Sequence, residues 1–417
     1  MLEAPSLSSG KAEPAERVPP AERVSPDRVR QYEFSLTQGE GADDPFDVLV
    51  PRINAGPEVY WSPEGLRPGE GGWIIRTDEE IRKVFLDTTS FTSAHISGVL
   101  QAIGSDQSLI PVEIDPPDHM WYRAFLNPMF SPVRMTALEG MVEREVTEMV
   151  RRLVAQGGCD FVEDFAIPLP VAIFLGLLGL PLSEMDTYVR WEKIMMSTLD
   201  PDLRVSTIRA IEQCLKDALA ERVAKPRDDV LSHLVNAEVR GRRMTMDECV
   251  NTGFTLFFAG LDTVTSSIGW YIKHLAEHQE DQKRLREDRE LLPLAMEELQ
   301  RAFPTVTVPR QAVKRYTTRE GIVIEPGETV LLCTPAAGRD PAVYDRPDEI
   351  VLDRNPTSVT FAYGVHRCLG SHLARRELRT SIRAMLDMVP PFRRPNSDRL
   401  PMRFGNVLAL ESLPLEW

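Results

Sequence analysis

The chain has 417 residues, 42% of them hydrophobic and 27% charged, which is typical of a globular protein with a large core. Its formal net charge of -15, from 48 basic and 63 acidic residues, argues against nucleic acid as a partner, because nucleic-acid binding needs a basic face. The odd number of widely spaced cysteines favours a reducing compartment and no signal peptide is visible, so we expect a cytoplasmic protein.

The first part of the chain predicts a disordered tail and then short elements. Residues 1–28 are rich in Pro, Ala, Glu and Arg and are expected to stay disordered. Short strands are expected at 59–61 and 73–75, and a capping box beginning at Thr77 predicts a helix. The uncharged stretch 165–182 contains three prolines, so we expect a short buried helix there and no membrane span.

Helical patterns dominate the rest of the chain. Helices are expected over 131–157, 183–197 and 202–224, and two more within 279–303. A capping box at Thr245-x-x-Glu248 opens a helix that is predicted to reach His278. At about 1.5 Å per residue it would span about 50 Å, and its apolar middle indicates a buried central helix.

The last third is expected to combine a small β portion with one more helix. A hairpin is predicted between the strands 322–324 and 330–332, because Pro326-Gly327 lies between them. Residues 334–360 show little periodicity, and a long irregular segment in a compact protein is usually functional. No linker divides 29–417, so we expect one mainly helical domain.

The most specific feature is the segment Phe361-Ala-Tyr-Gly364-Val-His-Arg-Cys368-Leu-Gly370, just before the last helix, expected at 369–387. At a helix start, unpaired N–H groups and the dipole stabilise a thiolate. The two glycines would let the backbone approach a flat ligand closely. For the other four cysteines, a buried and inert side chain is the simpler interpretation.

This segment matches the haem-binding loop of the cytochrome P450 family, Phe-x-x-Gly-x-His/Arg-x-Cys-x-Gly, at Phe361, Gly364, His366, Cys368 and Gly370. The chain resembles that family over about residues 30–417. The resemblance implies a single-domain, mainly α fold with a long central helix over haem b. It also implies that Cys368 ligates the iron and that Phe361 and Gly370 contact the haem. A thiolate ligand favours O–O cleavage.

A second motif is Glu298-x-x-Arg301. Residues three apart share a helix face and can form an ion pair, although solvated helices often carry the same spacing. In the family this pair is a structural element behind the haem, and the resemblance implies that Arg354 completes it.

A third motif, Asp262-Thr263, lies inside the expected central helix. Both residues are poor helix formers, and alone they would indicate a local kink. In the family they are the acid–alcohol pair. The resemblance implies that Asp262 relays protons from solvent and that Thr263 supports their delivery during oxygen activation.

A fourth set of residues is expected to bind the haem propionates. His119 and Arg123 lie four apart on an early helix, Arg310 follows the Glu298 helix, and His366 belongs to the cysteine segment. Taken singly, each is more typical of a surface charge. The resemblance implies that all four converge on the two carboxylates, for which cationic groups are suited.

Several segments, including 115–117 and 413–417, are similar to the bacterial camphor-hydroxylase branch of the family. That branch is soluble and takes electrons from a [2Fe–2S] ferredoxin, which an NADH-dependent reductase reduces. Four arginines gather in the cysteine segment and the helix after it, and they could form a basic patch that steers an acidic ferredoxin. A solvated helix face explains them equally well. They are Arg367, Arg375, Arg376 and Arg379.

The expected substrate pocket departs from that branch. Gln107 stands where camphor hydroxylase has the tyrosine that holds the camphor ketone, and an amide can also serve a ketone or alcohol. The changes favour a small apolar terpenoid or norisoprenoid, such as an ionone, over camphor. The other expected pocket residues are Thr255, Phe258, Val306, Asn406 and Val407.

Two alternatives to an O2-dependent monooxygenase remain at this point. One is a peroxide-driven haem-thiolate peroxygenase, and the other is a non-catalytic haem- or ligand-binding protein on the same fold. Asp262 and Thr263 argue against both, because neither function needs a proton relay.

Overall fold

The computed structural model describes residues 18–36, 42–66, 69–198 and 200–417. Helices form most of this part of the chain, as predicted. The α-helices are α1 (Val50–Asn54), α2 (Asp78–Leu86), α3 (Asp118–Met129), α4 (Pro132–Ala137), α5 (Glu139–Gln156), α6 (Pro168–Leu178), α7 (Met185–Ser197), α8 (Pro201–Ala224), α9 (Val230–Val235), α10 (Met246–Gly260), α11 (Asp262–Glu277), α12 (Gln279–Glu287), α13 (Leu292–Ala302), α14 (Thr334–Ala337) and α15 (Ser371–Met388).

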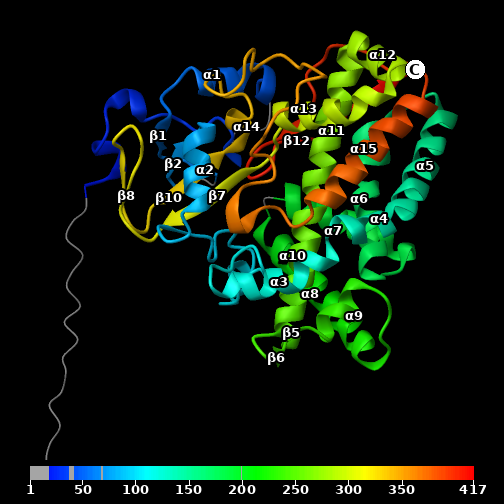
Figure 1. Ribbon diagram of the computed structural model, residues 1–417, viewed down its shortest axis with the longest axis horizontal. Helices are drawn as coiled ribbons and strands as arrows, with labels where there is room; N and C mark the ends of the chain where they lie inside the picture. The colour runs from blue at the N-terminus through cyan, green and yellow to red at the C-terminus, as the bar shows by residue number, and fades with distance from the viewer. Residues whose placement is uncertain (1–17, 37–41, 67–68, 199) are drawn as a thin grey trace, which may run out of the picture.

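The strands are short, and the largest sheet gathers on one side of the molecule, opposite α5, α6, α11 and α15 (Figure 1). They are β1 (Val59–Ser62), β2 (Gly72–Ile75), β3 (Phe91–Thr92), β4 (Gly158–Asp160), β5 (Glu238–Val239), β6 (Arg242–Arg243), β7 (Thr307–Ala312), β8 (Tyr316–Thr317), β9 (Val323–Ile324), β10 (Thr329–Cys333), β11 (Met402–Arg403), β12 (Ala409–Leu410) and β13 (Pro414–Glu416).

The largest sheet has the strand order β1-β2-β10-β7-β3. β10 lies at its centre, parallel to β2 and antiparallel to β7, with Leu331 opposite both Ile74 and Pro309. Ile74 and Leu331 are buried. The sheet is therefore anchored by apolar residues on its central strands, and the strands expected at 59–61 and 73–75 are confirmed as β1 and β2.

The predicted hairpin around Pro326-Gly327 is wrong. β9 pairs with β8 through a turn at Thr318–Gly321, whereas β10 pairs with β7 and β2. The Gly327 N–H donates to the Ala312 carbonyl, so this turn returns the chain to β7 instead of joining β9 to β10. Alternating apolar residues identify strands but not their partners.

The prediction of disorder for residues 1–28 is wrong for residues 18–28, and residues 1–17 lie outside the described residues. Pro20–Glu22 and Pro26–Arg28 form two short 3-10 helices. The Arg28 guanidinium pairs with Glu320 at 2.6 Å, and Arg23 pairs with Glu328 and stacks on Trp73. These contacts with the sheet region order a segment whose composition alone predicts disorder.

The helix expected after Thr77 is present as α2, but its predicted capping box does not form. The Thr77 side chain makes no cap hydrogen bond. Instead, the carboxylate of Asp340, distant in sequence, accepts from the Asp78 N–H at 2.9 Å. The orphan donor at this helix start is thus satisfied by the irregular segment after α14.

The long central helix is present but divided. Its capping box at Thr245 and Glu248 is confirmed. The helix is then interrupted at Leu261, although this residue keeps right-handed helical dihedrals, so that α10 and α11 replace the single helix predicted to reach 278. Gly260, Asp262 and Thr263 are all weak helix formers, which explains a break at this point.

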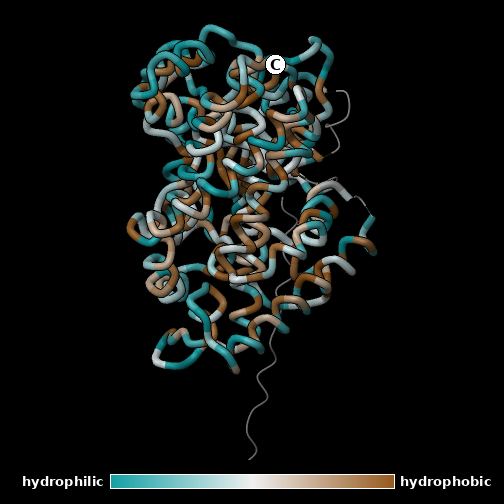
Figure 2. The backbone as a smooth tube through the Cα atoms, turned by 90° about the vertical axis from the view of Figure 1, so that its right-hand side faces the viewer, coloured by the Kyte–Doolittle hydropathy of each residue, from teal (hydrophilic) through white to brown (hydrophobic). Residues whose placement is uncertain are grey.

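Three clusters of buried apolar residues form the core, and hydrophobic segments run through the middle of the molecule while hydrophilic segments occupy its outer loops (Figure 2). α10 packs into one cluster through Phe254 and Phe257, together with α6, α8 and α9. α11 packs into another through Val264 and Ile268, together with α5, α13 and α15. The break at Leu261 is therefore also the border between two cores.

The uncharged stretch expected to form a short buried helix does so as α6, whose described side chains are almost all buried. Within the described ranges, no helix is both long enough and apolar enough to cross a membrane. α6 instead fills the interior, in contact with α5, α7 and α10.

The predicted Glu298–Arg301 pair is fully buried on α13. Arg301 donates two hydrogen bonds to Glu298, both 2.8 Å, and three to the carbonyls of Gly338, Pro347 and Glu349. Arg354 Nε adds a bond to Glu298 Oε1 at 3.1 Å. The three expected residues thus meet, and they tie the irregular segment to α13.

Replacing Arg301 with Ala should lower the free energy of unfolding by about 3–5 kcal/mol, because it leaves Glu298 charged, buried and unpaired. Urea unfolding followed by circular dichroism measures the change. Arg152→Ala, which removes an exposed partner of the exposed Glu148, is the control and should change stability little. A loss for Arg301→Ala no larger than that of the control would contradict the assignment.

Candidate active site

The cysteine segment forms a tight loop between the sheet and α15. The Cys368 N–H donates to the Phe361 carbonyl at 2.9 Å, which closes the loop. Gly364 has φ +69°, and a Cβ there would lie 2.9 Å from the Phe85 carbonyl oxygen, so glycine is required. The Arg375 guanidinium lies 4.3 Å from the centre of the Phe361 ring and fixes its orientation.

Cys368 is accessible, in contrast to Cys249 and Cys333, which are buried. Burial of the sulfur raises the pKa of the thiol above its ordinary value, although the Gly370 N–H and three nearby arginines act in the opposite direction. The helix start and the arginines thus favour the thiolate, whereas burial opposes it. A bound metal cation would supply the missing stabilisation of the charged form.

The helix break exposes a short stretch in the middle of the molecule. Ala259 and Gly260 are exposed, although Phe257 and Leu261 on either side are buried. A Cβ at Gly260 would meet no atom within 4 Å. The Thr263 hydroxyl donates to the Ala259 carbonyl at 3.0 Å, which stabilises the break and leaves its oxygen free to accept a hydrogen bond.

Asp262 starts α11 beside Thr263, and its side chain is buried. Its Oδ1 accepts from Arg403 Nη2 at 2.5 Å, whereas its Oδ2 has no hydrogen-bond partner in the described part of the chain. Arg403 lies on β11, 141 residues away in sequence, and was not predicted. It supplies the cation that balances the buried carboxylate.

Four donor side chains that were expected to converge do lie together. The His119 and His366 rings are 4.3 Å apart, and Arg123 and Arg310 act on both rings. Burial, with these neighbours, lowers the pKa of His119 to about 4 and that of His366 to about 3. Both imidazoles are therefore neutral at pH 7.

Two of the four donors are incompletely satisfied. Both ring nitrogens of His119 are buried without a partner among the described residues. Arg310 is 7% exposed, and its guanidinium makes one hydrogen bond within the described ranges, to the adjacent Pro309 carbonyl. Buried donors normally have acceptors, so this cluster is suited to an anion. Ser93, whose hydroxyl lies 3.3 Å from His366 Nε2, was not predicted.

Gln107 does not present its amide to an interior space. It is exposed, its Oε1 accepts from Asn251 Nδ2 at 2.5 Å, and its Nε2 donates to Asp247 at 3.2 Å. The expectation that Gln107 holds a substrate is therefore corrected. The glutamine instead fastens its loop to the start of α10.

The other expected pocket residues lie on two elements. Thr255 is buried and Phe258 is partly buried on α10. Val306 and Val407 form an isolated β-bridge, which places Asn406 at the edge of the large sheet. Asn406 lines a cavity of about 380 Å³ with residues of β3, β7 and β10, of the loop at 94–96 and of the segment before β2.

The sequence matches that of known proteins over nearly its whole length. It matches the Cytochrome P450 family over residues 202–389. It is 33% identical over 404 residues to the probable cytochrome P450 127A1 of Sinorhizobium fredii, covering 96% of this chain and 97% of that protein. The chain belongs to the cytochrome P450 family. The P450 is also 32% identical over 324 residues to the steroid C26-monooxygenase of Mycolicibacterium smegmatis, covering 75% and 81%.

Two solved P450 structures share the fold. CYP101C1 is 31% identical with a TM-score of 0.84, covering 96% of this chain and 100% of its own. CYP101J2 is 26% identical with the same TM-score, covering 95% and 98%. These likenesses confirm the predicted single-domain fold and the similarity to the camphor-hydroxylase branch. The P450 is a monooxygenase, and its cofactor is haem b.

The residues present fit haem b. Gly260 and Gly370 have open space where a Cβ would lie, and Cys368 is accessible as a sulfur ligand. Both ring nitrogens of His119 are buried without a partner in the described ranges, and the buried guanidinium of Arg310 lies beside them. A planar group that carries carboxylates and needs a thiolate would satisfy each of these features.

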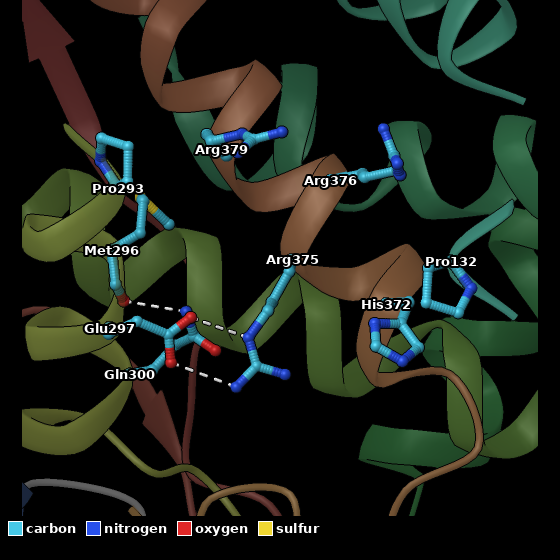
Figure 3. A pocket seen from close by; sticks show the side chains of 9 residues that line it. All are labelled: Pro132, Pro293, Met296, Glu297, Gln300, His372, Arg375, Arg376 and Arg379. Carbon is cyan, nitrogen blue, oxygen red and sulfur yellow. Dashed lines mark hydrogen bonds and ion pairs between the residues drawn. The ribbon is translucent and has the colours of Figure 1, made fainter. Parts of the chain in front are cut away.

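Beyond the cysteine loop, α15 and α13 border a surface depression of about 210 Å³ (Figure 3). Arg375 Nε donates to Glu297 at 2.7 Å, and Arg376 pairs with Glu139 at 2.8 Å. No ion pair of Arg367 or Arg379 is found within the described ranges. The basic patch is therefore weaker than its four arginines suggest, because two of them are neutralised.

Proposed function

We propose that this P450 hydroxylates a small apolar terpenoid or norisoprenoid of ionone-like shape. In this proposal it uses O2 and electrons from a [2Fe–2S] ferredoxin that an NADH-dependent reductase reduces. The observation that carries the proposal is the helix break, where the Thr263 oxygen and a buried, half-satisfied Asp262 lie side by side. Such a pair suits proton delivery, which neither a peroxygenase nor a binding protein needs.

Cys368 would hold the haem iron, with Phe361 and Gly370 beside it. His119, Arg123, Arg310 and His366 would bind the propionates, since the two histidine rings lie together beside both arginines and the His119 nitrogens have no partner among the described residues. Haem b, when bound, supplies the electron transfer and oxygen chemistry that side chains cannot perform.

The protons would be moved by the chain itself. Arg403 holds Oδ1 of Asp262 by a hydrogen bond, and the free Oδ2 can accept a proton and release it to Thr263 or to a water beside it. The Thr263 hydroxyl donates to Ala259, so its oxygen is oriented as an acceptor. Asp262 would thus carry protons and Thr263 would fix the point of their delivery.

The pocket assignment uses the remaining expected residues. In this proposal Thr255 and Phe258 on α10, with Val306 and Val407, would form a mainly apolar lining, and Asn406 would offer one amide. A ligand with one ketone or hydroxyl group on a hydrocarbon frame matches this combination.

The partner and compartment are proposed on different grounds. The likeness to CYP101C1 and CYP101J2 supports a ferredoxin, and Arg367 and Arg379 remain available to steer an acidic one. All five cysteines are free, which supports a reducing compartment such as the cytoplasm.

The dithionite-reduced protein should give a strongly red-shifted Soret band with carbon monoxide, because a thiolate donates electron density to the iron. Cys368→Ala should abolish that shift, while Cys159→Ala, the control at a partly buried cysteine, should keep it. A shifted band in Cys368→Ala would refute the ligand assignment.

Thr263→Ala should keep NADH consumption but lower product per NADH by about tenfold or more, with peroxide released, because the protons are no longer directed. Ser267→Ala removes an equivalent bond to a carbonyl one turn further along α11 and serves as the control. Unchanged product per NADH, measured by chromatography and an NADH assay, would exclude the proton relay.

β-Ionone should shift the ferric haem to high spin at lower concentrations than camphor does, since Asn406 and Phe258 shape a different pocket. Visible titration measures both dissociation constants. Asn406→Leu should raise the dissociation constant of β-ionone about tenfold, which corresponds to the loss of one hydrogen bond. Equal binding of camphor by the native protein would argue against the proposed substrate class.

A further inference from the structure

We propose that Glu297 is a positioning residue that holds the Arg375 guanidinium against the Phe361 ring and so keeps a positive charge beside the iron-binding sulfur. This inference rests on the proposed ligation of the haem iron by Cys368. It gives a functional role to a surface ion pair that neither the sequence motifs nor the proposed proton pathway uses.

Three contacts connect Glu297 to the cysteine loop. Arg375 Nε and Nη2 donate to the two carboxylate oxygens of Glu297 at 2.7 and 3.1 Å, which makes a bidentate pair. The centre of the Phe361 ring lies 4.3 Å from Cζ of the same guanidinium, and the Phe361 carbonyl accepts from the Cys368 N–H at 2.9 Å. The Arg375 charge also acts directly on the Cys368 sulfur. One side chain of α13 is thus linked to the iron ligand through two others.

Arg375 needs a tether because it borders the surface depression between α13 and α15 (Figure 3). That depression of about 210 Å³ leaves room for the guanidinium to turn away from Phe361. Within the described ranges, Glu297 is the only residue to which the Arg375 side chain donates a hydrogen bond. A cation–π contact with a partly exposed ring is weak, so the carboxylate decides where the guanidinium stays.

Glu297 and Glu298 are consecutive on α13, and they serve opposite ends of the loop. Consecutive residues of a helix do not face each other. Glu298 is buried and, through Arg301 and Arg354, fixes the irregular segment before the loop. Glu297 pairs instead with α15, which follows the loop. One turn of one helix therefore holds the chain on both sides of Cys368.

The pair is too exposed for a large effect on stability. The side chains of Arg375 and Glu297 are 31% and 35% exposed, and such ion pairs contribute little to the free energy of folding. A positive charge close to the iron, in contrast, favours the addition of an electron and so raises the reduction potential. The position of Arg375 therefore matters more for electron transfer than for folding.

The test measures the reduction potential of the ferric haem in the haem-loaded enzyme by spectroelectrochemistry. If Glu297 acts by positioning, Glu297→Gln releases Arg375 and the potential falls, so that the ratio of reduced to oxidised haem at a fixed applied potential drops about threefold. If Glu297 acts only through its own charge, the same variant removes a negative charge and the potential rises. A rise, or an unchanged potential, would overturn the proposal.

Two further variants and one control complete the comparison. Arg375→Lys keeps the charge but can neither form the bidentate pair nor stack as a plane, so its potential should also fall. Glu297→Gln made in an Arg375→Gln background should no longer lower the potential, because no guanidinium is left to position. Glu143→Gln removes the exposed partner of Arg383, further along α15, and should leave the potential as it is. A fall of equal size in this control would contradict the assignment.

Hydrogen exchange gives a readout that does not depend on the potential. The Cys368 N–H is protected by its bond to the Phe361 carbonyl. It should exchange faster in Glu297→Gln, where the ring is no longer held, than in the native protein or Glu143→Gln. Mass spectrometry of the peptide that contains the loop measures the rate, and equal rates would argue against positioning.

The underlying ligation is tested separately. If Cys368→Ala loses the red-shifted band with carbon monoxide while Glu297→Gln keeps the native potential, only this inference fails. If Cys368→Ala keeps that band, the proposed ligation of the iron fails.

Discussion

The Arg301 guanidinium is the interaction on which the position of the cysteine loop depends. Its five N–H donors are all used, two on Glu298 and three on backbone carbonyls of the irregular segment. That segment has little regular structure of its own before Gly364, so a buried cation replaces the usual backbone ladder. The chain leaves this anchor and reaches Cys368 in a fixed direction, held further by the closing bond to Phe361.

The rest of the site is distinguished by buried polar groups whose hydrogen bonds are incomplete. The buried histidines are kept neutral, the buried arginine Arg310 keeps unused donors, and Asp262 has one satisfied and one free oxygen. Each of these groups is costly to bury alone. Their presence is explained if the unpaired donors bind the carboxylates of a cofactor and the free carboxylate oxygen accepts a proton. The imbalance is therefore informative about function, since a purely structural interior would have removed it.

The sequence predicted those features that depend on neighbours within a few residues. The capping box at Thr245, the Glu298–Arg301 pair and the cysteine loop are of this kind. Contacts across long stretches of chain could not be predicted, such as Arg403 with Asp262. Gln107 was misassigned because a sequence does not show whether an amide is already bound by the protein. The prediction of a hairpin at Gly327 was wrong for a related reason, since the residue pattern of a strand does not show which strand it pairs with.

The border between two cores at Leu261 has an evolutionary consequence. Phe254 and Phe257 before it belong to one packed cluster, and Val264 and Ile268 after it belong to another. Substitutions add up independently where the sites share no contacts. The partly buried side chains of Met185 and Val189 pack against both clusters, so they are places where a substitution in one core can reach the other. Away from them the division makes the scaffold modular, so one core can change while the other is inherited unchanged.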